Sequence, residues 1–205
     1  MSLLFDPARL PIAAALPRGA AFDIDALCVE DERNADLPAR EALLDEAFGP
    51  QRLAKTSQRL RDGRLPADGL ALVARDGDEL VATLRCWSVK AGDRPALLLG
   101  PLAVAEAHRS LGIGARMMRE ALWRAGAQGH RAVILVGDAP YYARFGFEAA
   151  LTAGLELPGP VDRARFLGFE IAPDALNGAK GLVIATGRRI ATSARAKPAA
   201  WRRAA

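Results

Sequence analysis

The chain has 205 residues, of which 51% are hydrophobic and 25% are charged, and this composition excludes a collagen-like, disulfide-rich or largely disordered chain. Six basic and no acidic residues lie in 188–205, so the formal net charge of +4 becomes −2 over residues 1–187, and the body of the chain has no basic bias that would indicate nucleic acid. We expect a single domain over residues 1–187 and a basic, disordered tail over residues 188–205.

The N-terminal region has no pattern of a membrane span or a signal peptide. Its apolar run, residues 12–16, is much shorter than the roughly 20 residues that a membrane-spanning helix needs. Asp6 and Arg9 precede this run, where a signal peptide carries basic residues alone. Cys28 and Cys86 have no CxxC or Cys/His spacing, so we expect two reduced core thiols and no metal site. The sequence therefore predicts a cytoplasmic protein that contacts no membrane.

The first quarter of the chain combines one strand pattern with two helix patterns. Residues 20–29 are expected to form the first strand. Apolar side chains then recur at helical spacing up to Phe48, where Gly49 and Pro50 end the helix. A second helix is expected over residues 52–61.

The next segment predicts two antiparallel strands joined by a tight turn. Residues 70–74 and 79–89 flank Asp76-Gly77-Asp78, whose glycine supplies the positive φ that such a turn needs. Residues 96–104 follow as a nearly unbroken apolar run, which is typical of a central strand covered on both faces.

Gly100 and Pro101 interrupt that apolar run. Proline has no N–H for the hydrogen-bond ladder, so a proline inside a buried strand indicates a bulge or a divergence from a neighbouring strand. We expect the strand over residues 96–104 to bend at this point.

A strand–helix–strand unit comes next. Apolar residues recur with a period of 3.6 over residues 113–125, and residues 132–136 form another buried strand. This order predicts a parallel, right-handed crossover. A short helix over 141–144 and strands over 166–171 and 182–186 complete the chain. The expected fold is α/β, with a mixed, largely antiparallel sheet of about seven strands and flanking helices.

The segment Arg109-Ser110-Leu111-Gly112-Ile113-Gly114 separates the interrupted strand from the long helix. Two glycines at a helix start let the backbone approach an anion closely, while the first-turn N–H groups and the helix dipole favour negative charge. A pyrophosphate fits such a loop. A turn that merely starts a helix is the alternative interpretation.

Taken together, these segments resemble the GNAT superfamily of N-acetyltransferases. The runs GPLAVAEAHRSLGIGARMM and AVILVGDAPYYARFGF carry the resemblance, which covers residues 96–147 specifically and residues 20–187 loosely. The loop lacks GxGxxG and a Gly-Lys-Ser/Thr ending, so it is neither a Rossmann nor a Walker loop. The resemblance implies a GNAT-like acyl-CoA N-acyltransferase fold and an enzyme that transfers acetyl from acetyl-CoA to a primary amine by direct attack in a ternary complex. A non-catalytic acyl-CoA sensor or scaffold is the alternative.

The resemblance also implies where acetyl-CoA binds. In the family the loop holds the pyrophosphate, and the pantetheine arm lies along the bulged strand like an extra strand. The residues expected to bind the cosubstrate are Leu102, Ala103, Val104, Arg109, Ser110, Leu111, Gly112, Ile113, Gly114 and Ala115. Many relatives carry glycine and a basic residue where this chain has Ser110 and Leu111, so Arg109, Arg116 and Arg144 are the residues expected to restore the positive charge.

Tyr142 matches the tyrosine that in many relatives protonates or hydrogen-bonds the departing CoA sulfur. A phenol with a pKa of about 10 is a weaker acid than a thiol with a pKa of about 8.5, so a hydrogen bond to the thiolate is enough for this role. The alternative is that Tyr141 and Tyr142 both pack on a short helix.

The general base and the acceptor have no clear signature. No carboxylate lies in residues 96–104, and Glu106, His108 and Asp138 each have a structural interpretation as well as a catalytic one. We expect a small-molecule or peptide amine as acceptor, and we expect residues near 33–61 and 151–177 to determine the specificity for it. Nucleic acid is not expected as a partner, although the basic tail leaves a salt-sensitive contact open. A homodimer is also left open.

Overall fold

The computed structural model describes residue 24 and residues 27–191, and the elements below are those of this part of the chain. Eight strands form the sheet in the order β1-β2-β3-β4-β5-β7, with β8 paired to β3 and β6. The strands are β1 (Cys28–Asp31), β2 (Ala71–Asp76), β3 (Glu79–Ala91), β4 (Arg94–Val104), β5 (Ala132–Val136), β6 (Leu155–Glu156), β7 (Phe166–Glu170) and β8 (Gly181–Ala185). Only the β4–β5 and β6–β8 pairs are parallel among these strands, so the predicted mixed, largely antiparallel sheet is confirmed.

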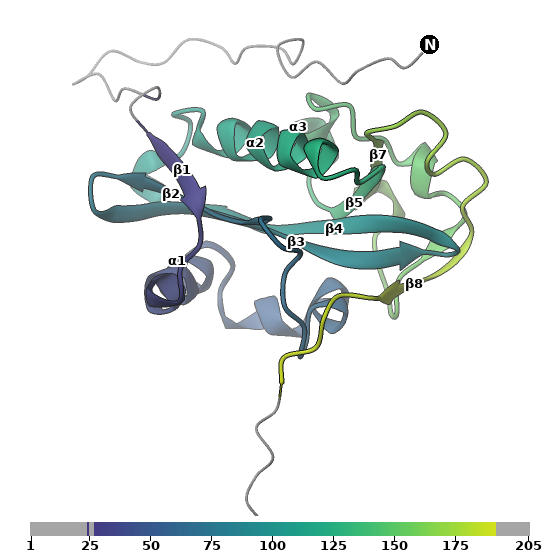
Figure 1. The fold of residues 1–205 in the computed structure, drawn as a ribbon, viewed down its shortest axis with the longest axis horizontal. Helices are drawn as coiled ribbons and strands as arrows, with labels where there is room; N and C mark the ends of the chain where they lie inside the picture. The colour runs from purple at the N-terminus through teal and green to yellow at the C-terminus, as the bar shows by residue number, and fades with distance from the viewer. Residues whose placement is uncertain (1–23, 25–26, 192–205) are drawn as a thin grey trace, which may run out of the picture.

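Helices cover both faces of the sheet. The long helix α2 (Ile113–Ala127) crosses one face, α1 (Leu37–Phe48) lies against the other, and the short α3 (Ala139–Ala143) follows β5 (Figure 1). The apolar stripe of α2 is buried as predicted, and its most enclosed members are Met117, Met118 and Leu122. Burying a side chain of this size stabilises a fold by roughly 1.5–3 kcal/mol, so this stripe holds α2 and its N-terminus firmly on the sheet.

The segment after α1 differs from the prediction. Instead of one helix over 52–61, two 3-10 helices form, Pro50–Ala54 and Thr56–Leu60. Lys55 between them has extended backbone angles, φ −63° and ψ 142°, which no helix interior accommodates. The chain therefore turns twice in a short space and places Lys55 at a corner.

Several smaller expectations need correction. The first strand was expected over 20–29, but β1 begins at Cys28; Ile24 lies in a turn, and residues 20–23, 25 and 26 lie outside the described residues. Cys28 is exposed at the edge of the sheet, so the prediction of a core thiol is wrong there. It is correct for Cys86, which is buried. The two-residue strand β6 was not predicted.

The bulge expected in β4 is present. Leu84 of β3 faces Leu102 and Cys86 faces Leu99, so Gly100 and Pro101 together oppose one residue of β3. The Gly100-Pro101 peptide bond is cis. The carbonyl oxygen of Gly100 accepts a hydrogen bond from Trp87 Nε1 at 2.8 Å, which fixes the bulge to its neighbouring strand.

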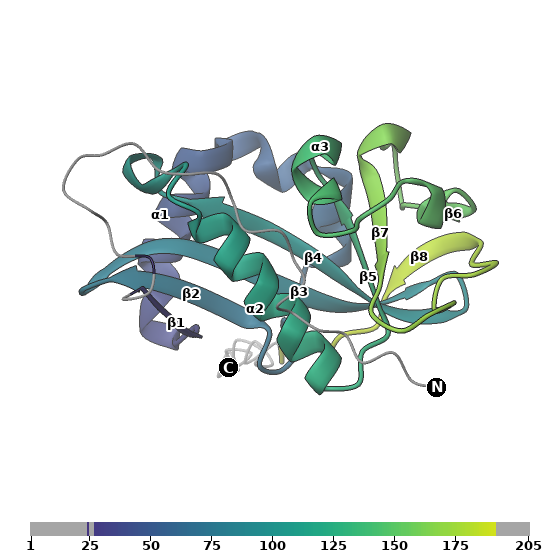
Figure 2. The ribbon, with the colours of Figure 1, turned by 90° about the horizontal axis from the view of Figure 1, so that it is seen from above.

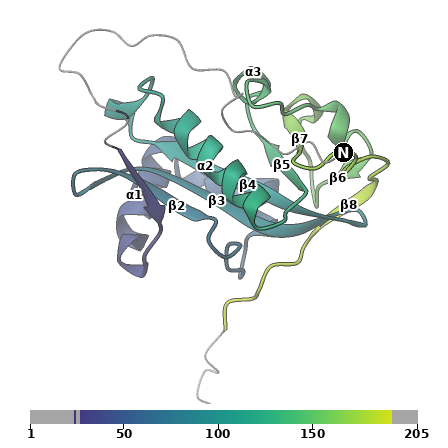
Figure 3. The ribbon, with the colours of Figure 1, turned by 45° about the horizontal axis from the view of Figure 1, so that its top comes forward.

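Beyond the bulge, β4 and β5 separate. The two parallel strands pair only at Leu97–Val133 and Leu98–Ile134 and then diverge, which leaves a V-shaped split in the sheet (Figures 2 and 3). α3 stands beside the wide end of this split (Figure 2). The sequence predicted the bend, and the structure shows that it opens the sheet on the β5 side.

Residues 188–190, assigned to the tail by the sequence, pair with the domain. Leu65 N donates to Arg188 O at 2.8 Å, and Ile190 N donates to Gly63 O at 2.9 Å. Residues 188–190 of the expected tail are therefore hydrogen-bonded to the domain, and residues 192–205 lie outside the described residues. None of the described helices is long and apolar enough to cross a membrane.

Candidate active site

The loop before α2 presents free backbone donors. Gly112 caps the helix with φ +84°, and Ser110 also has a positive φ of 64°. The first bond inside the helix runs from Arg116 N to Gly112 O at 3.0 Å, and no side chain of the described residues caps this end. The N–H groups of the first turn therefore have no helical acceptor and, with the helix dipole, favour an anion.

A cleft of about 460 Å³ lies over this helix start. Its lining comprises Val104, His108, Arg109, Ser110, Gly112, Ile113, Gly114, Ala115, Tyr141 and Arg144. All the residues predicted for the loop line it except Leu111, whose side chain packs against the core. Of the three arginines expected to restore charge, Arg109 and Arg144 line the cleft, while Arg116 donates to the carbonyl of Ile24 instead.

A second cleft of about 450 Å³ occupies the split between β4 and β5. It shares Val104, Gly114 and Tyr141 with the first cleft, so the two adjoin at Tyr141. The absence of a side chain at Gly114 keeps this junction open, because a Cβ there would lie 2.7 Å from the Tyr141 hydroxyl oxygen. Together the clefts form a path from the start of α2 to the bulge.

The backbone of β4 offers its groups alternately to β3 and to the split. Ala105 N donates to Val81 O of β3 at 2.8 Å, so Ala103, two residues earlier, also directs its groups toward β3. Leu102 and Val104 face the open edge, and Val104 O accepts from Arg109 Nε at 3.3 Å. Of the three residues predicted as backbone partners, Leu102 and Val104 line the second cleft and Ala103 does not.

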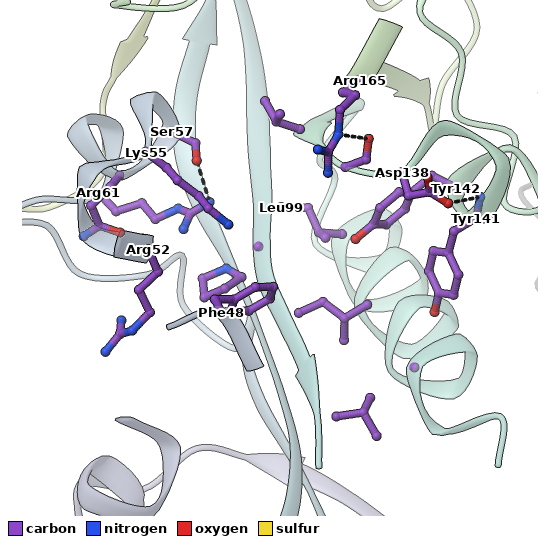
Figure 4. A pocket seen from close by; sticks show the side chains of 18 residues that line it. Phe48, Arg52, Lys55, Ser57, Arg61, Leu99, Asp138, Tyr141, Tyr142 and Arg165 are labelled. Atoms are coloured by element: carbon purple, nitrogen blue, oxygen red, sulfur yellow. Dashed lines mark hydrogen bonds between the residues drawn. The ribbon is translucent and has the colours of Figure 1, made fainter. Parts of the chain in front are cut away.

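Tyr142 projects from α3 into the second cleft, toward Leu99 beside the bulge (Figure 4). Its ring packs edge-on against Tyr141, with ring centres 5.0 Å apart, and a Cβ at Gly137 would lie 2.1 Å from this ring. Burial raises the pKa of Tyr142 to about 12, so its hydroxyl keeps its proton at neutral pH. The geometry makes Tyr142 a hydrogen-bond donor aimed at the split.

The three base candidates are separated by the fold. Asp138 lines the second cleft, and its carboxylate accepts a hydrogen bond from Tyr141 N at 3.3 Å as the cap of α3. His108 lines the first cleft with Nε2 3.3 Å from an oxygen of Asp76. Glu106 lines neither cleft. Only Asp138 of the three is in place to accept a proton near the bulge.

Sequence reasoning missed the cations that line the second cleft. On one wall Lys55 lies between the two 3-10 helices and Arg61 follows the second of them, and on the other wall Arg165 ends the 3-10 helix Arg163–Arg165 before β7 (Figure 4). Burial lowers the pKa of Arg61 to about 10. These residues carry no local motif, because only the folded sheet brings segments about a hundred residues apart to one cleft.

Comparison with known proteins gives concordant matches. A family model described as an acetyltransferase (GNAT) domain matches residues 67–149. An uncharacterized N-acetyltransferase of Escherichia coli, YhbS, is 36% identical over 152 residues, which cover 72% of this chain and 89% of YhbS.

Two solved structures share the fold. The crystal structure of E. coli YhbS in complex with CoA has a TM-score of 0.67 and 32% identity, covering 78% of this chain and 89% of that one. A GNAT family acetyltransferase from Brucella melitensis, in complex with acetyl-CoA, has a TM-score of 0.59 and 25% identity, covering 78% of this chain and 96% of that one.

Proposed function

This chain belongs to the GNAT superfamily of N-acetyltransferases, and from that premise we propose that it transfers the acetyl group of acetyl-CoA to a primary amine by direct attack in a ternary complex. The observation that carries this proposal is the pair of adjoining clefts, one over the free N–H groups of α2 and one in the split beside Tyr142. The relatives solved with CoA and acetyl-CoA support the choice of cosubstrate.

The pyrophosphate of acetyl-CoA would lie on the first cleft. The N–H groups of Ile113, Gly114 and Ala115 point into a site that also holds Arg109 and Arg144, so both dipole and full charges favour a diphosphate. The pantetheine arm would then pass Tyr141 and follow β4. Its amides would pair with the backbone groups of Leu102 and Val104 at the open edge.

The thioester would lie at the bulge. Pro101 has no N–H, so Leu102 is the first residue beyond the bulge with an N–H at the open edge, and we assign it the hydrogen bond to the thioester carbonyl oxygen. The amine lone pair attacks the carbonyl carbon, a C–N bond forms, and the C–S bond then breaks. Tyr142 donates a hydrogen bond to the sulfur as the CoA thiolate leaves.

The attacking amine must lose one proton. Asp138 is the carboxylate that lines this cleft among the described residues, and we assign it the acceptance of that proton, directly or through water. Cys86 is buried and burial raises the pKa of its thiol to about 12, so a covalent acetyl-cysteine intermediate is not part of the proposal.

Binding and turnover together test this function. Isothermal titration should show that acetyl-CoA binds the full chain, and a thiol-release assay over a panel of primary amines should show CoA formation that depends on the amine. Binding without amine-dependent release would instead support the sensor or scaffold. Absence of binding would contradict both interpretations.

A further inference from the structure

Three positively charged side chains converge on the part of the second cleft where the acceptor amine would bind. Lys55 and Arg61 on one wall and Arg165 on the other are here called the cationic cluster (Figure 4). Lys55 lies over the ring of Phe48, 4.8 Å from the ring centre. Arg165 is held by a bond from its Nε to Gly137 O at 3.2 Å. Burial lowers the pKa of Lys55 below its ordinary value, and the positive charges of Arg165 and Arg61 lower it further.

Among the described residues no carboxylate forms an ion pair with the cationic cluster, although the charge of the neighbouring Asp62 acts on Arg61. Within residues 27–191, no ion pair is formed by Lys55, Arg61 or Arg165, whereas Arg52 at the rim is neutralised by Glu41 and Asp45. Arg61 donates one hydrogen bond, to Ser57 Oγ at 3.3 Å, and its Nε is shielded from solvent without a partner among the described residues. Burying a cation without an ion-pair partner is costly, and this cost falls on Arg61, whereas Lys55 and Arg165 are exposed cations that face the same cleft. An anion in the cleft would therefore be stabilised by all three.

Few carboxylates oppose the cluster. Asp138 lines the same cleft but is the cap of α3 and, in the proposed mechanism, takes the proton. Asp162 lies farther out, where its carboxylate accepts a hydrogen bond from Ala164 N at 3.0 Å. Because one carboxylate lines this cleft beside the three cations of the cluster, the cleft disfavours a polycationic acceptor.

The space beyond the cluster is lined by both polar and apolar side chains. A further cleft of about 360 Å³ shares Lys55, Ser57, Val136 and Arg165 with the second cleft. Its outer wall includes Leu157 and Val161. An acceptor that fills both clefts thus meets Arg61 beside Gly100 of the bulge, then Lys55 and Arg165, and last a wall that includes Leu157 and Val161.

We propose that the acceptor is a small amine whose reacting nitrogen lies within a few bonds of an anionic group, a carboxylate or a phosphate, and whose remaining part is apolar. A free apolar α-amino acid has this arrangement, whereas a polyamine or an internal lysine side chain does not. The cationic cluster would hold the anion and turn the amine toward the bulge. This inference rests on the proposed function, and the experiment below separates the two.

A matched pair of acceptors tests the charge. Leucine and leucinamide differ only in the carboxylate, and the carboxylate raises the pKa of the neighbouring amine, so intrinsic reactivity near neutral pH favours leucinamide. We expect kcat/KM for leucine to exceed that for leucinamide by about 10-fold or more, the effect of a charge-assisted hydrogen bond. Putrescine should be the poorest acceptor, and 2-aminoethyl phosphate shows whether phosphate replaces carboxylate. Equal or better use of leucinamide or putrescine would overturn the inference.

Product binding gives a readout that needs no turnover. With CoA present, N-acetylleucine should bind about 10-fold more tightly than N-acetylleucinamide in isothermal titration. Equal affinity, or no binding of either compound, overturns the inference even if acetyl-CoA binds and other amines react. Failure of the proposed function looks different, because then no amine in the panel releases CoA.

Variants test whether the cationic cluster causes the preference for leucine over leucinamide. Lys55→Glu and Arg165→Glu change exposed residues, and each should reduce the leucine preference about 10-fold and leave acetyl-CoA affinity unaltered. Arg61→Gln tests the partly buried member. Arg94→Gln and Lys90→Gln, which remove charge on β4 and β3 outside both clefts, are the matched controls and should keep the preference. A preference that survives both glutamate variants would contradict the assignment.

Discussion

At the scale of single residues, Tyr142 and Tyr141 are neighbours in sequence with different surroundings. The Tyr142 ring lies against Gly137 and aims its hydroxyl at the split, while the Tyr141 hydroxyl lies next to Gly114 at the junction of the clefts. The sequence shows that two tyrosines are adjacent but not where each ring points. The directions of the rings suggest different roles, Tyr142 at the leaving sulfur and Tyr141 along the path of the pantetheine arm.

Tyr142→Phe should therefore lower kcat by about 100-fold and change the acetyl-CoA dissociation constant by less than about twofold. The substitution keeps the packed ring and removes the hydroxyl that we propose donates a hydrogen bond to the sulfur. Steady-state kinetics and isothermal titration of the same preparation check both values. Tyr141→Phe is the matched control and should reduce kcat less; a larger effect at Tyr141 would reverse the assignment.

The raised pKa of Tyr142 also predicts a pH profile. A phenol donates its hydrogen bond only below its pKa, and burial places that pKa at about 12, so ionisation of Tyr142 should not lower kcat below about pH 11. A decline in kcat centred near pH 10 that disappears in Tyr142→Phe would contradict this environment for the hydroxyl.

At the scale of elements, β4 and α2 were predictable and the 3-10 segments were not. The apolar period of α2 and the proline within β4 are local signals, and both dictate backbone geometry directly. The helix expected over 52–61 is interrupted at Lys55, whose backbone is extended, although residues 51–61 contain no Gly or Pro that would mark the break. β6 has two residues, too few for any alternation of side chains to show.

Gly114 tests the junction between α2 and α3. Because Gly114 lies inside a helix, alanine should not destabilise the fold, but its methyl group would meet the Tyr141 hydroxyl at 2.7 Å. Gly114→Ala should weaken acetyl-CoA binding by about 10-fold at an unchanged melting temperature. In Gly126→Ala the new methyl would have an ordinary contact of 3.4 Å with Ile171, so this control should bind normally. Normal binding by Gly114→Ala would contradict the path past Tyr141.

Asp36 links the start of α1 to the sheet. Its carboxylate accepts from Arg33 N at 2.8 Å and pairs with Arg75 of β2. The Arg33 N–H, followed by Arg75, lowers the pKa of Asp36 in spite of burial. A lowered pKa stabilises the fold above the ordinary carboxyl pKa of about 3.9, and this stabilisation is lost as the pH falls through the lower folded value.

Asp36→Asn should consequently lower the free energy of unfolding by about 1–3 kcal/mol at pH 7 and by much less at pH 3. Urea denaturation at the two pH values measures the difference. Asp45→Asn, on the exposed side of the same helix, should cost less than about 1 kcal/mol. A penalty at Asp36 that does not shrink in acid would show that the charge is not the cause.

At the scale of the whole molecule, the candidate site is assembled from distant parts of the chain. The loop and Tyr142 carry recognisable local patterns, so the sequence indicates them as candidates. The members of the cationic cluster, Lys55, Arg61 and Arg165, are far apart in the sequence, and only the fold brings them together across the split. These three residues form no motif in the sequence, so the sequence alone predicts no binding site for the acceptor.

The C-terminal segment gives a prediction at this scale. We propose one domain that extends to about residue 190, because residues 188–190 bond to residues 63–65. Removing residues 192–205 should leave the melting temperature and turnover unchanged, whereas removing residues 188–205 should lower the melting temperature by several degrees. Differential scanning calorimetry of both truncations checks this boundary, and equal melting temperatures would place it before residue 188.

The separation of β4 from β5 has a consequence for dynamics. Past Leu98 this edge of β4 has no neighbouring strand in the described part of the chain, so the amides of Leu102 and Val104 are expected to exchange their hydrogens with solvent quickly. If the pantetheine arm pairs with them, acetyl-CoA should slow that exchange, while Ala103, bonded to β3, should change little. In each catalytic cycle the pantetheine arm would then extend the sheet at the edge of β4, like an additional strand, and would leave again with CoA.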